Sequence, residues 1–183
     1  MSRPRILLTA PPRAGKTTVV RRLAELLRAD GVPVYGFLSG EVREHGHRVG
    51  FTVAEIGGAE AVMAHVSWVS GPRVGRYGVN VPAFERVALP ALERAMAAAP
   101  GAVALIDEIG PMELLSPAFV PRCLELFGAG GPIVATVHHR GHPAADALKA
   151  ELAAEVMAVT AQNRDELPGR LRSMLAGDSP PPA

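Results

Sequence analysis

One stretch near the N-terminus, Ile6 to Val20, constrains the fold more than any other part of the chain. It opens as a short apolar run typical of a buried strand, continues through poor helix formers, and ends in Gly-Lys-Thr-Thr at 15–18. A strand, a tight loop and a helix start in this order direct unpaired backbone N–H groups and the positive end of a helix dipole at one place. The stretch therefore predicts a phosphate cradle, in which Gly15 allows close approach, Lys16 reaches the β and γ phosphates, and the Thr17 hydroxyl can ligate Mg²⁺.

The cradle departs from the strict G-x-x-x-x-G-K-[ST] pattern in one place, because Ala10 stands where the first glycine is expected. The alternative interpretation is a helix start that binds no ligand. Lysine usage favours the phosphate interpretation: Lys16 and Lys149 are the only lysines in an arginine-rich chain. A lysine at this position indicates that a compact point charge is needed there.

Length and composition exclude several classes of protein. A chain of 183 residues is most simply one domain with a full α/β core, and its net charge of +1 gives no strong nucleic-acid signal. No stretch approaches the roughly 20 apolar residues that span a bilayer. The single Cys123 excludes an internal disulfide framework and is interpreted as a small buried residue on a helix. We expect a cytoplasmic monomer with no membrane association.

The order of apolar runs and helical patterns predicts the fold class. Strands are expected at 5–9, 32–38, 103–106, 132–137 and 156–159, and helices at 16–29, from Pro90, from Ser116-Pro117, briefly after His142-Pro143 and from Asn163. This alternation predicts a three-layer α/β P-loop fold of the RecA-like kind with a mostly parallel sheet. The segment 40–81 is expected to insert antiparallel strands, with a hairpin turning at His45-Gly46 and a further extended segment at 73–81. We predict a single domain over 1–177 and a disordered tail at 178–183.

A second motif ends the apolar run at 103–106, where Asp107 and Glu108 follow directly. In parallel α/β sheets, ligands bind at the edge where such strands end. Asp107 can hold Mg²⁺ directly or through water, and Glu108 can orient and deprotonate a water that attacks the γ phosphorus. Taken alone, the pair could be a strand end with solvated acids; together with Lys16 and Thr17 it predicts nucleoside triphosphate binding.

Several segments resemble the thermophile-type nucleoside-triphosphatase family, also called cancer-related NTPase. The segments are A-P-P-R-A-G-K-T-T at 10–18, G-F-L-S-G-E-V-R-E-H-G-H-R-V-G-F at 36–51, R-Y-G-V-N-V at 76–81, F-E at 84–85, I-D-E-I-G-P-M-E-L at 106–114, A-T-V-H at 135–138 and Asn163-Arg164. Together they span about residues 5 to 175.

This resemblance implies slow, Mg²⁺-dependent hydrolysis of ATP, GTP and other nucleoside triphosphates with broad base tolerance. The family's phosphate-binding segment corresponds to Ala10, Pro11, Pro12, Arg13, Ala14, Gly15, Lys16 and Thr17, with Thr18 following. Its Walker-B segment corresponds to Val103, Ala104, Leu105, Ile106, Asp107, Glu108, Ile109 and Gly110. Family members usually have glycine at positions 10 and 13, and we hypothesise that the Arg13 charge tightens nucleotide binding.

Three weaker groups of residues have roles that the sequence leaves open. His138 or Thr136, at the end of the 132–137 strand, can sense the γ phosphate. The alternative is a metal site at His138, His139 and His142, but these residues do not have a regular ligand spacing. Arg43, Arg48 and Arg76 lie in the inserted segment, and Arg43 is the preferred candidate for a catalytic arginine over the alternative of a surface arginine.

Asn163 is interpreted first as a helix N-cap, with Glu166 completing a capping box. The pair Asn163-Arg164 is also a candidate contact for the nucleobase.

The sequence thus predicts a Mg²⁺-dependent nucleoside triphosphatase in which Glu108 positions water, Lys16 stabilises transferred charge, and Thr17 and Asp107 hold the metal. One alternative is a small kinase, which shares the P-loop and the size. The other is a nucleotide-gated binding protein linked to RNA, although the aromatic content of 4% supplies little stacking surface.

Overall fold

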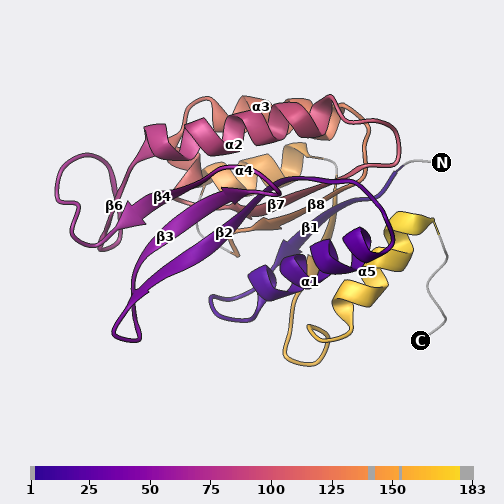
Figure 1. Ribbon diagram of the computed structural model, residues 1–183, viewed down its shortest axis with the longest axis horizontal. Coiled ribbons are helices and arrows are strands. Elements are labelled where there is room, and N and C mark those ends of the chain that lie inside the picture. The colour runs from indigo at the N-terminus through magenta and orange to yellow at the C-terminus, as the bar shows by residue number, and fades with distance from the viewer. Residues whose placement is uncertain (1–2, 140–142, 153, 178–183) are drawn as a thin grey trace.

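The computed structural model describes residues 3–139, 143–152 and 154–177, and its central element is a nine-stranded sheet (Figure 1). Along the sheet the strands follow the order β5 (Arg73–Val74), β6 (Tyr77–Val79), β4 (Glu60–His65), β3 (His47–Glu55), β2 (Val34–Glu44), β7 (Val103–Ile109), β8 (Ile133–Val137), β1 (Arg5–Thr9) and β9 (Glu155–Ala158). The strands from β2 to β9 pair in parallel, and those from β5 to β2 pair antiparallel. The expected α/β class with an antiparallel insertion is confirmed.

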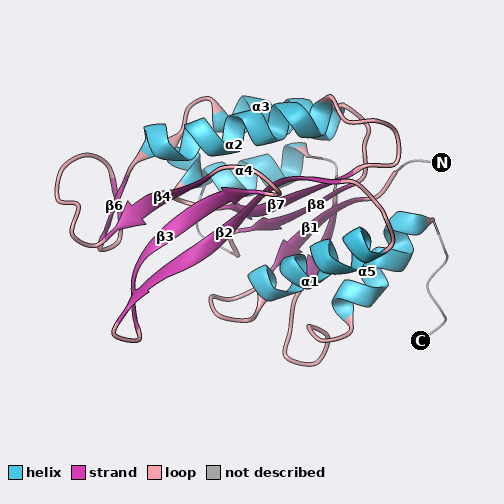
Figure 2. Ribbon diagram, in the orientation of Figure 1, coloured by secondary structure: helices cyan, strands magenta, loops and turns pink. Residues whose placement is uncertain are grey.

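Helices cover both faces of the sheet (Figure 2). On one face lie α1 (Lys16–Ala29) and α5 (Leu167–Ala176); on the other lie α2 (Val81–Met96), α3 (Phe119–Gly128) and α4 (Pro143–Glu151). Each face has its own cluster of buried apolar side chains. Among the described residues, no helix is both long and apolar enough to span a membrane.

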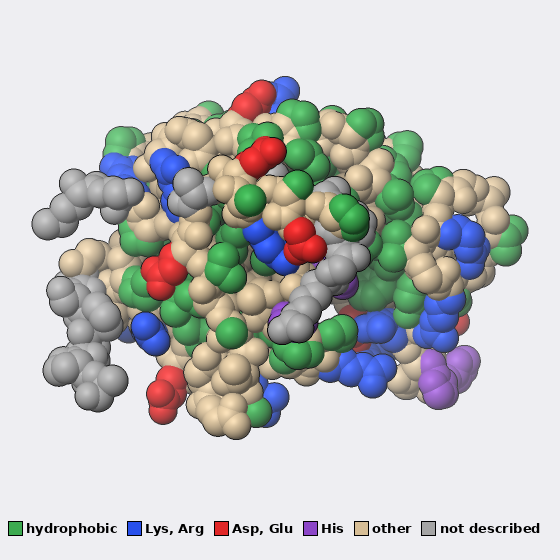
Figure 3. Space-filling model, turned by 180° about the vertical axis from the view of Figure 1, so that it is seen from behind, with side chains coloured by type: hydrophobic (Ala, Val, Ile, Leu, Met, Phe, Trp, Pro, Cys, Tyr) green, Lys and Arg blue, Asp and Glu red, His purple; other side chains and the backbone are tan. Residues whose placement is uncertain are grey.

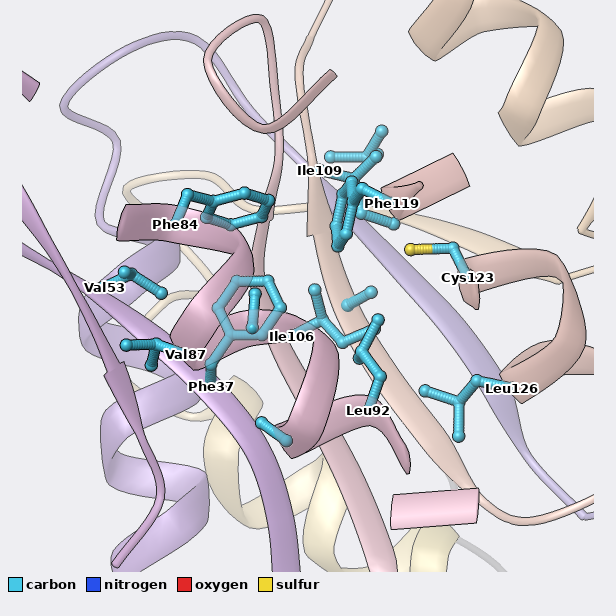
Figure 4. Packing of buried hydrophobic residues seen from close by; sticks show 14 of the residues in the cluster. Phe37, Val53, Phe84, Val87, Leu92, Ile106, Ile109, Phe119, Cys123 and Leu126 are labelled. Atoms are coloured by element: carbon cyan, nitrogen blue, oxygen red, sulfur yellow. The ribbon is translucent and has the colours of Figure 1, made fainter. Parts of the chain in front are cut away.

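The core under α2 and α3 is organised by aromatic side chains from three elements (Figure 4). Phe37, Phe84 and Phe119 are almost fully buried. Their ring centroids lie 5.2 to 5.9 Å apart, and two of the three pairs are edge-on. Edge-to-face contacts at this spacing are favourable beyond the area that they bury. Cys123 lies in the same cluster as a small buried side chain, which confirms its interpretation from sequence.

The β2–β3 hairpin extends past the edge at which the parallel strands end. β2 pairs with β7 only over 34–37 and continues to Glu44 alongside β3. The chain turns at His45 and Gly46, with φ of 47° and 80°, as a tight two-residue hairpin turn requires. The predicted hairpin and its turn are therefore confirmed, and in Figure 1 the hairpin projects beside the loop that precedes α1.

Two other expectations for this part of the sheet need correction. The second strand does not end at 38 but runs unbroken to Glu44, and the sequence analysis missed β4. β4 was missed because Glu60–His65 alternates weakly, with both Val62 and Glu60 exposed. The single domain over 1–177 stays a prediction, and the tail at 178–183 lies outside the described residues.

The predicted helix from Pro90 is wrong, because α2 begins at Val81 and passes through Pro90. Its true start is Asn80, whose side chain accepts a hydrogen bond from the Ala83 N–H at 3.0 Å. A proline inside a helix costs roughly 3 kcal/mol. The helix persists because its inner face is buried along its length, at Ala83, Phe84, Val87, Ala88, Ala91 and Leu92.

Two further helix starts lie later than expected. α3 begins at Phe119, and the Ser116 hydroxyl does not cap it but donates to Glu85 at 2.6 Å. α5 begins at Leu167, so the predicted capping box of Asn163 and Glu166 is wrong.

We predict that Phe84→Ala lowers the free energy of unfolding by about 3–5 kcal/mol, because the truncation leaves a cavity between two aromatic neighbours. Urea unfolding would measure the loss. The matched control is Val69→Ala, since Val69 is 83% exposed and its truncation should change stability by less than about 0.5 kcal/mol. Equal effects of the two substitutions would contradict the central place of the aromatic cluster.

Candidate active site

The predicted phosphate cradle connects β1 to α1. Residues 10–15 form the connection, Gly15 precedes the helix with a φ of 102°, and Lys16 is the first helical residue. The Lys16 ammonium donates to the Ala10 carbonyl at 3.2 Å and lies 3.6 Å from a carboxylate oxygen of Glu108. The two motifs, about 90 residues apart in sequence, therefore meet at the edge where the parallel strands end.

Asp107 is buried beneath this pair and is held by two hydroxyl groups. Its side chain has 0% exposure. The Ser39 hydroxyl donates to Oδ2 at 2.8 Å, and the Thr136 hydroxyl donates to Oδ1 at 2.6 Å. These two bonds from β2 and β8 fix the carboxylate in one orientation while leaving further lone pairs on both oxygens.

Glu108 points from the same strand into the cleft. Burial raises the pKa of Glu108 above its ordinary value, and the charge of Asp107 adds to this, while the Lys16 ammonium lowers the pKa. The net shift is upward. A carboxylate whose pKa is raised accepts a proton more readily, as a general base requires.

A third carboxyl group, Glu113, lies beside Glu108. It belongs to the 3₁₀ turn Glu113–Leu115 and is 6% exposed. A methyl group added at Gly110 would lie 2.5 Å from an oxygen of Glu108 and 3.0 Å from an oxygen of Glu113. Both carboxyl groups thus lie close to Gly110, and a side chain at this position would have to displace them. Burial, followed by the charge of Glu108, raises the pKa of Glu113 to about 8.

Ser39 and Glu113 are the site residues that the sequence analysis did not assign. Both lie inside segments that carry the family resemblance, at 36–51 and 106–114. A polar residue directly after the buried strand at 34–38 was the available signal for Ser39. Glu113 follows a turn, and nothing local indicates that this turn folds back onto Glu108.

A cleft of 1320 Å³ extends from the cradle to the β2–β3 hairpin. Among the predicted site residues, it is lined by Ala10, Pro11, Pro12, Arg13, Ala14, Gly15, Lys16, Thr17, Thr18, Arg43, Glu108 and His138. Val103, Ala104, Leu105, Ile106 and Ile109 do not line it, because they are buried inside β7. Those five side chains position the strand and offer no surface to a ligand.

Arg43 lies in the hairpin, away from the cradle. Its guanidinium donates to Glu41 from Nε at 2.9 Å and from Nη2 at 2.6 Å, and to the Gly46 carbonyl from Nη1 at 3.0 Å. Burial raises the pKa of Glu41, but the hydrogen bonds from Arg48 and Arg43 outweigh it, so the pKa is lowered. Arg43 is four positions after Ser39 on an extended strand, which places its Cα about 13 Å further along β2.

The other candidates divide between the cleft and its surroundings. Thr136 is fully buried and bound to Asp107, whereas His138 lines the cleft. Among the described residues, no three His, Cys, Asp or Glu side chains gather as a metal site, and His142 lies outside the described residues. The carboxylate of Asp107 and the hydroxyl of Thr17 are the oxygen ligands that Mg²⁺ prefers, with water and phosphate completing its shell.

Asn163 stabilises the loop before α5. Its Oδ1 accepts from the Thr160 N–H at 2.9 Å, and its Nδ2 donates to the Ala158 carbonyl at 2.8 Å. The neighbouring Arg164 places its Cδ 3.5 Å from the position that a side chain on Gly15 would take. Arg164 therefore lies beside Gly15 at the start of α1, and its contact with a nucleobase stays a prediction.

Comparison with known proteins agrees with this geometry. A family model described as NTPase matches residues 5–171. The chain belongs to this NTPase family. It is 43% identical over 180 residues to the nucleoside-triphosphatase THEP1 of Thermofilum pendens, which covers 96% of this chain and 97% of that protein. It is 37% identical over 173 residues to the cancer-related nucleoside-triphosphatase of Homo sapiens, covering 88% and 91%.

Solved structures of NTPase family members have the same fold. The crystal structure of THEP1 from Aquifex aeolicus matches with a TM-score of 0.82 at 34% identity, covering 93% of this chain and 98% of that one. The solution structure of a human cancer-related nucleoside triphosphatase matches with a TM-score of 0.81, also at 34% identity, covering 97% and 100%. The suspected family and the fold class are both confirmed.

Positions 10 and 13, where the family resemblance implies glycine, differ in backbone conformation. Arg13 has a φ of 67°, and Arg13 and His45 are the non-glycine residues with positive φ in the described part of the chain. Position 10 therefore does not require glycine, and the Ala10 methyl group is buried in the core under α1. Arg13 occupies a left-handed backbone conformation that glycine adopts at lower cost. The arginine at this position therefore carries a conformational cost that glycine would not.

We predict that the stability of this NTPase falls between pH 5.5 and pH 8 because of Glu113. The folded protein keeps this carboxyl protonated up to about pH 8, whereas in the unfolded chain it ionises near its ordinary pKa of about 4.3. Between these values the folded state binds more protons, so its stability decreases as the pH rises. Glu113→Gln removes the titration and should reduce the pH-dependent loss by on the order of 3 kcal/mol.

Urea unfolding at both pH values, in buffer with chelator, would measure this difference. The matched control is Glu25→Gln, because Glu25 is exposed on α1 and its substitution should leave the wild-type pH dependence in place. An unchanged slope in Glu113→Gln would show that Glu113 is ionised in the folded protein.

Proposed function

We propose that the chain hydrolyses nucleoside triphosphates, ATP and GTP among them, to the diphosphate and phosphate with the help of Mg²⁺. The observation that carries the proposal is the 3.6 Å approach of the Lys16 ammonium to the Glu108 carboxylate, both of which line the cleft. The relatives named nucleoside-triphosphatases support the reaction class.

The cradle would bind the triphosphate by charge and backbone donors. The N–H groups at the start of α1 and the helix dipole favour the phosphate anions, and Lys16 exchanges Glu108 for the β and γ oxygens. Releasing Glu108 from this ion pair frees the carboxylate as a base. Lys16 then stabilises the charge that builds up on the transferred phosphoryl group.

Mg²⁺, when bound, would neutralise charge on the β and γ phosphates. Asp107 would hold the ion or one of its waters, and the Thr17 hydroxyl would ligate it. The hydroxyls of Ser39 and Thr136 keep the Asp107 carboxylate oriented for this. The chemistry of the donors fits such an ion, since both are oxygen ligands; Thr17 lines the cleft, whereas Asp107 is fully buried and does not.

Glu108 would accept a proton from the attacking water. The oxygen of that water forms a bond to the γ phosphorus while the bond to the bridging oxygen breaks, leaving the nucleoside diphosphate. Two observations support this role for Glu108: the pKa of its carboxyl group is raised, and its side chain lines the cleft.

We expect turnover to be slow and base tolerance to be broad. Arg43 is bonded to Glu41 and to the Gly46 carbonyl, so it would have to leave these partners to reach the γ phosphate. An arginine at that place would accelerate hydrolysis by about 10³–10⁵. The cytoplasmic location and the monomeric state also remain predictions.

Replacing the proposed base should change the rate of hydrolysis without weakening nucleotide binding. Glu108→Gln should lower the rate of phosphate release by about 10² or more, because the amide accepts no proton. The affinity for nucleotide should be retained or increased, since Lys16 loses a competing partner. Phosphate release from a panel of nucleoside triphosphates, with nucleotide affinity measured in parallel, provides the test. Glu25→Gln serves as control, and retained activity in Glu108→Gln would refute the assignment.

The charge of Arg13 gives a second, independent prediction. Arg13 lines the cleft, so we expect Arg13→Gly to weaken nucleotide binding through the loss of a cation near the phosphates, by about tenfold. The same substitution relieves the positive φ and should raise stability slightly. Arg13→Lys, which keeps the charge and the strain, is the matched control. Unchanged affinity in Arg13→Gly would remove the hypothesis.

A further inference from the structure

The antiparallel half of the cleft holds a group of arginines that take no part in the hydrolysis as proposed. Arg43 on β2, Arg48 on β3 and Arg76 in the turn between β5 and β6 all line it; we refer to these three as the arginine cluster. Figure 3 shows Lys and Arg side chains gathered beside His side chains at the end of the molecule where the antiparallel strands lie.

The cluster is held in place by rings and by one hydroxyl. The Arg48 guanidinium lies 4.9 Å from the centroid of the Phe51 ring, and that of Arg76 lies 5.2 Å from the centroid of the Tyr77 ring. The Tyr77 hydroxyl accepts from Arg48 at 3.2 Å and from Arg76 at 3.3 Å. Arg76 also donates to the Arg48 carbonyl, which ties the turn to β3. Such fixed guanidinium groups lose little entropy when they bind a ligand.

The charges in the cluster are poorly compensated. Arg43 and Arg48 are direct cross-strand partners, an arrangement of like charges that destabilises a hairpin. Both share one carboxylate, that of Glu41. Among the ion pairs between described residues, Arg76 has no carboxylate partner. Three cations around one anion favour the arrival of a second anion.

Donors remain for such an anion. In bonds between described residues, Arg48 donates from Nε and Nη1, and Arg76 donates only from Nη2. Three guanidinium nitrogens therefore remain available to solvent or a ligand: Nη2 of Arg48, and Nε and Nη1 of Arg76. Guanidinium forks match the oxygens of a phosphate group in pairs.

The arginine cluster lies along the hairpin and opens into the same cleft as the cradle. Arg43 lies about 13 Å along β2 beyond the residue that holds Asp107. The cleft volume of 1320 Å³ also exceeds the roughly 300–1,000 Å³ of a typical single-ligand pocket. A β-bulge between Val42 and Arg43 turns the end of the hairpin, as bulges beside binding sites do.

We propose that the arginine cluster binds the phosphate group of a second small molecule, a phosphate monoester such as a nucleoside monophosphate, while the cradle holds the nucleoside triphosphate. This rests on the proposed function only in placing the triphosphate at the cradle. The monoester would be held with its phosphate among the free donors of Arg48 and Arg76 and with its other end toward Glu108. The Glu41 side chain, 38% exposed, would move aside or share the arginines.

Calorimetric titration of AMP tests the proposal. The protein is first saturated with Mg²⁺ and a non-hydrolysable ATP analogue, so that AMP is kept from the cradle, and adenosine is titrated in parallel. We expect AMP to bind and adenosine not to bind. Arg76→Gln should weaken AMP binding about tenfold or more, as expected for charge-assisted hydrogen bonds. Arg76→Lys, which keeps the charge but loses the fork, should show a smaller loss.

The matched control is Arg86→Gln, which removes the same charge from an exposed position on α2 outside the cleft and should leave AMP affinity unchanged. Thermal unfolding of each variant verifies that it is folded. Absence of AMP binding, or equal affinities in Arg76→Gln and Arg86→Gln, would overturn the proposal. A short single-stranded RNA that binds more tightly than AMP, with the loss confined to Arg76→Gln, would overturn the small-molecule class.

Hydrolysis by the wild-type protein is measured separately. Normal hydrolysis without AMP binding would overturn this inference and leave the proposed function standing. If the analogue itself fails to bind, the proposed function fails, and the same AMP titrations on the protein alone still decide whether the arginine cluster is a phosphate site.

Discussion

The site depends on how three neighbouring acidic side chains are accommodated when one ammonium group pairs with only one of them. Asp107, Glu108 and Glu113 lie at the end of one buried strand and the turn that follows it, and Lys16 is the cation beside them. Burying an unpaired carboxylate is costly, so each acid is stabilised differently. Asp107 receives two hydroxyl hydrogen bonds, Glu108 pairs with Lys16, and Glu113 keeps its proton.

The same arrangements provide interactions that a metal ion and a triphosphate would take over. A cation near Asp107 would replace charge compensation that hydroxyls supply only in part. A triphosphate would take Lys16 from Glu108 and leave that carboxylate poised beside the γ phosphorus. On binding, the Lys16–Glu108 ion pair would be exchanged for contacts between Lys16 and the phosphate oxygens.

Much of the fold and of the cradle could be predicted from sequence because the determining signals are local. The apolar run at 5–9, the Gly15-Lys16 pair and the acids after 103–106 each lie within a few residues of the structure that they specify. The hairpin turn was predictable for the same reason, since His45-Gly46 tolerates positive φ. Where packing overrides local preference, prediction failed: Pro90 is carried inside α2 by buried neighbours, and Asn163 bonds within its loop instead of capping a helix.

The remaining parts of the site come from the folded sheet. Ser39 reaches Asp107 because β2 and β7 are neighbours, and Glu113 reaches Glu108 because a turn folds back over Gly110. Neither pairing has a sequence signal of its own.

The sheet itself divides the cleft into two chemically different halves. Its parallel strands end together and gather the groups proposed to bind a triphosphate, whereas β2 alone continues past that edge and pairs with β3. This overhang carries Arg43 and Arg48, and the turn before β6 adds Arg76, each fixed by an aromatic ring or a carboxylate. Fixed guanidinium groups at this place suit a second anion in addition to the triphosphate. The antiparallel insertion is therefore best understood as the part of the molecule that determines what else enters the cleft.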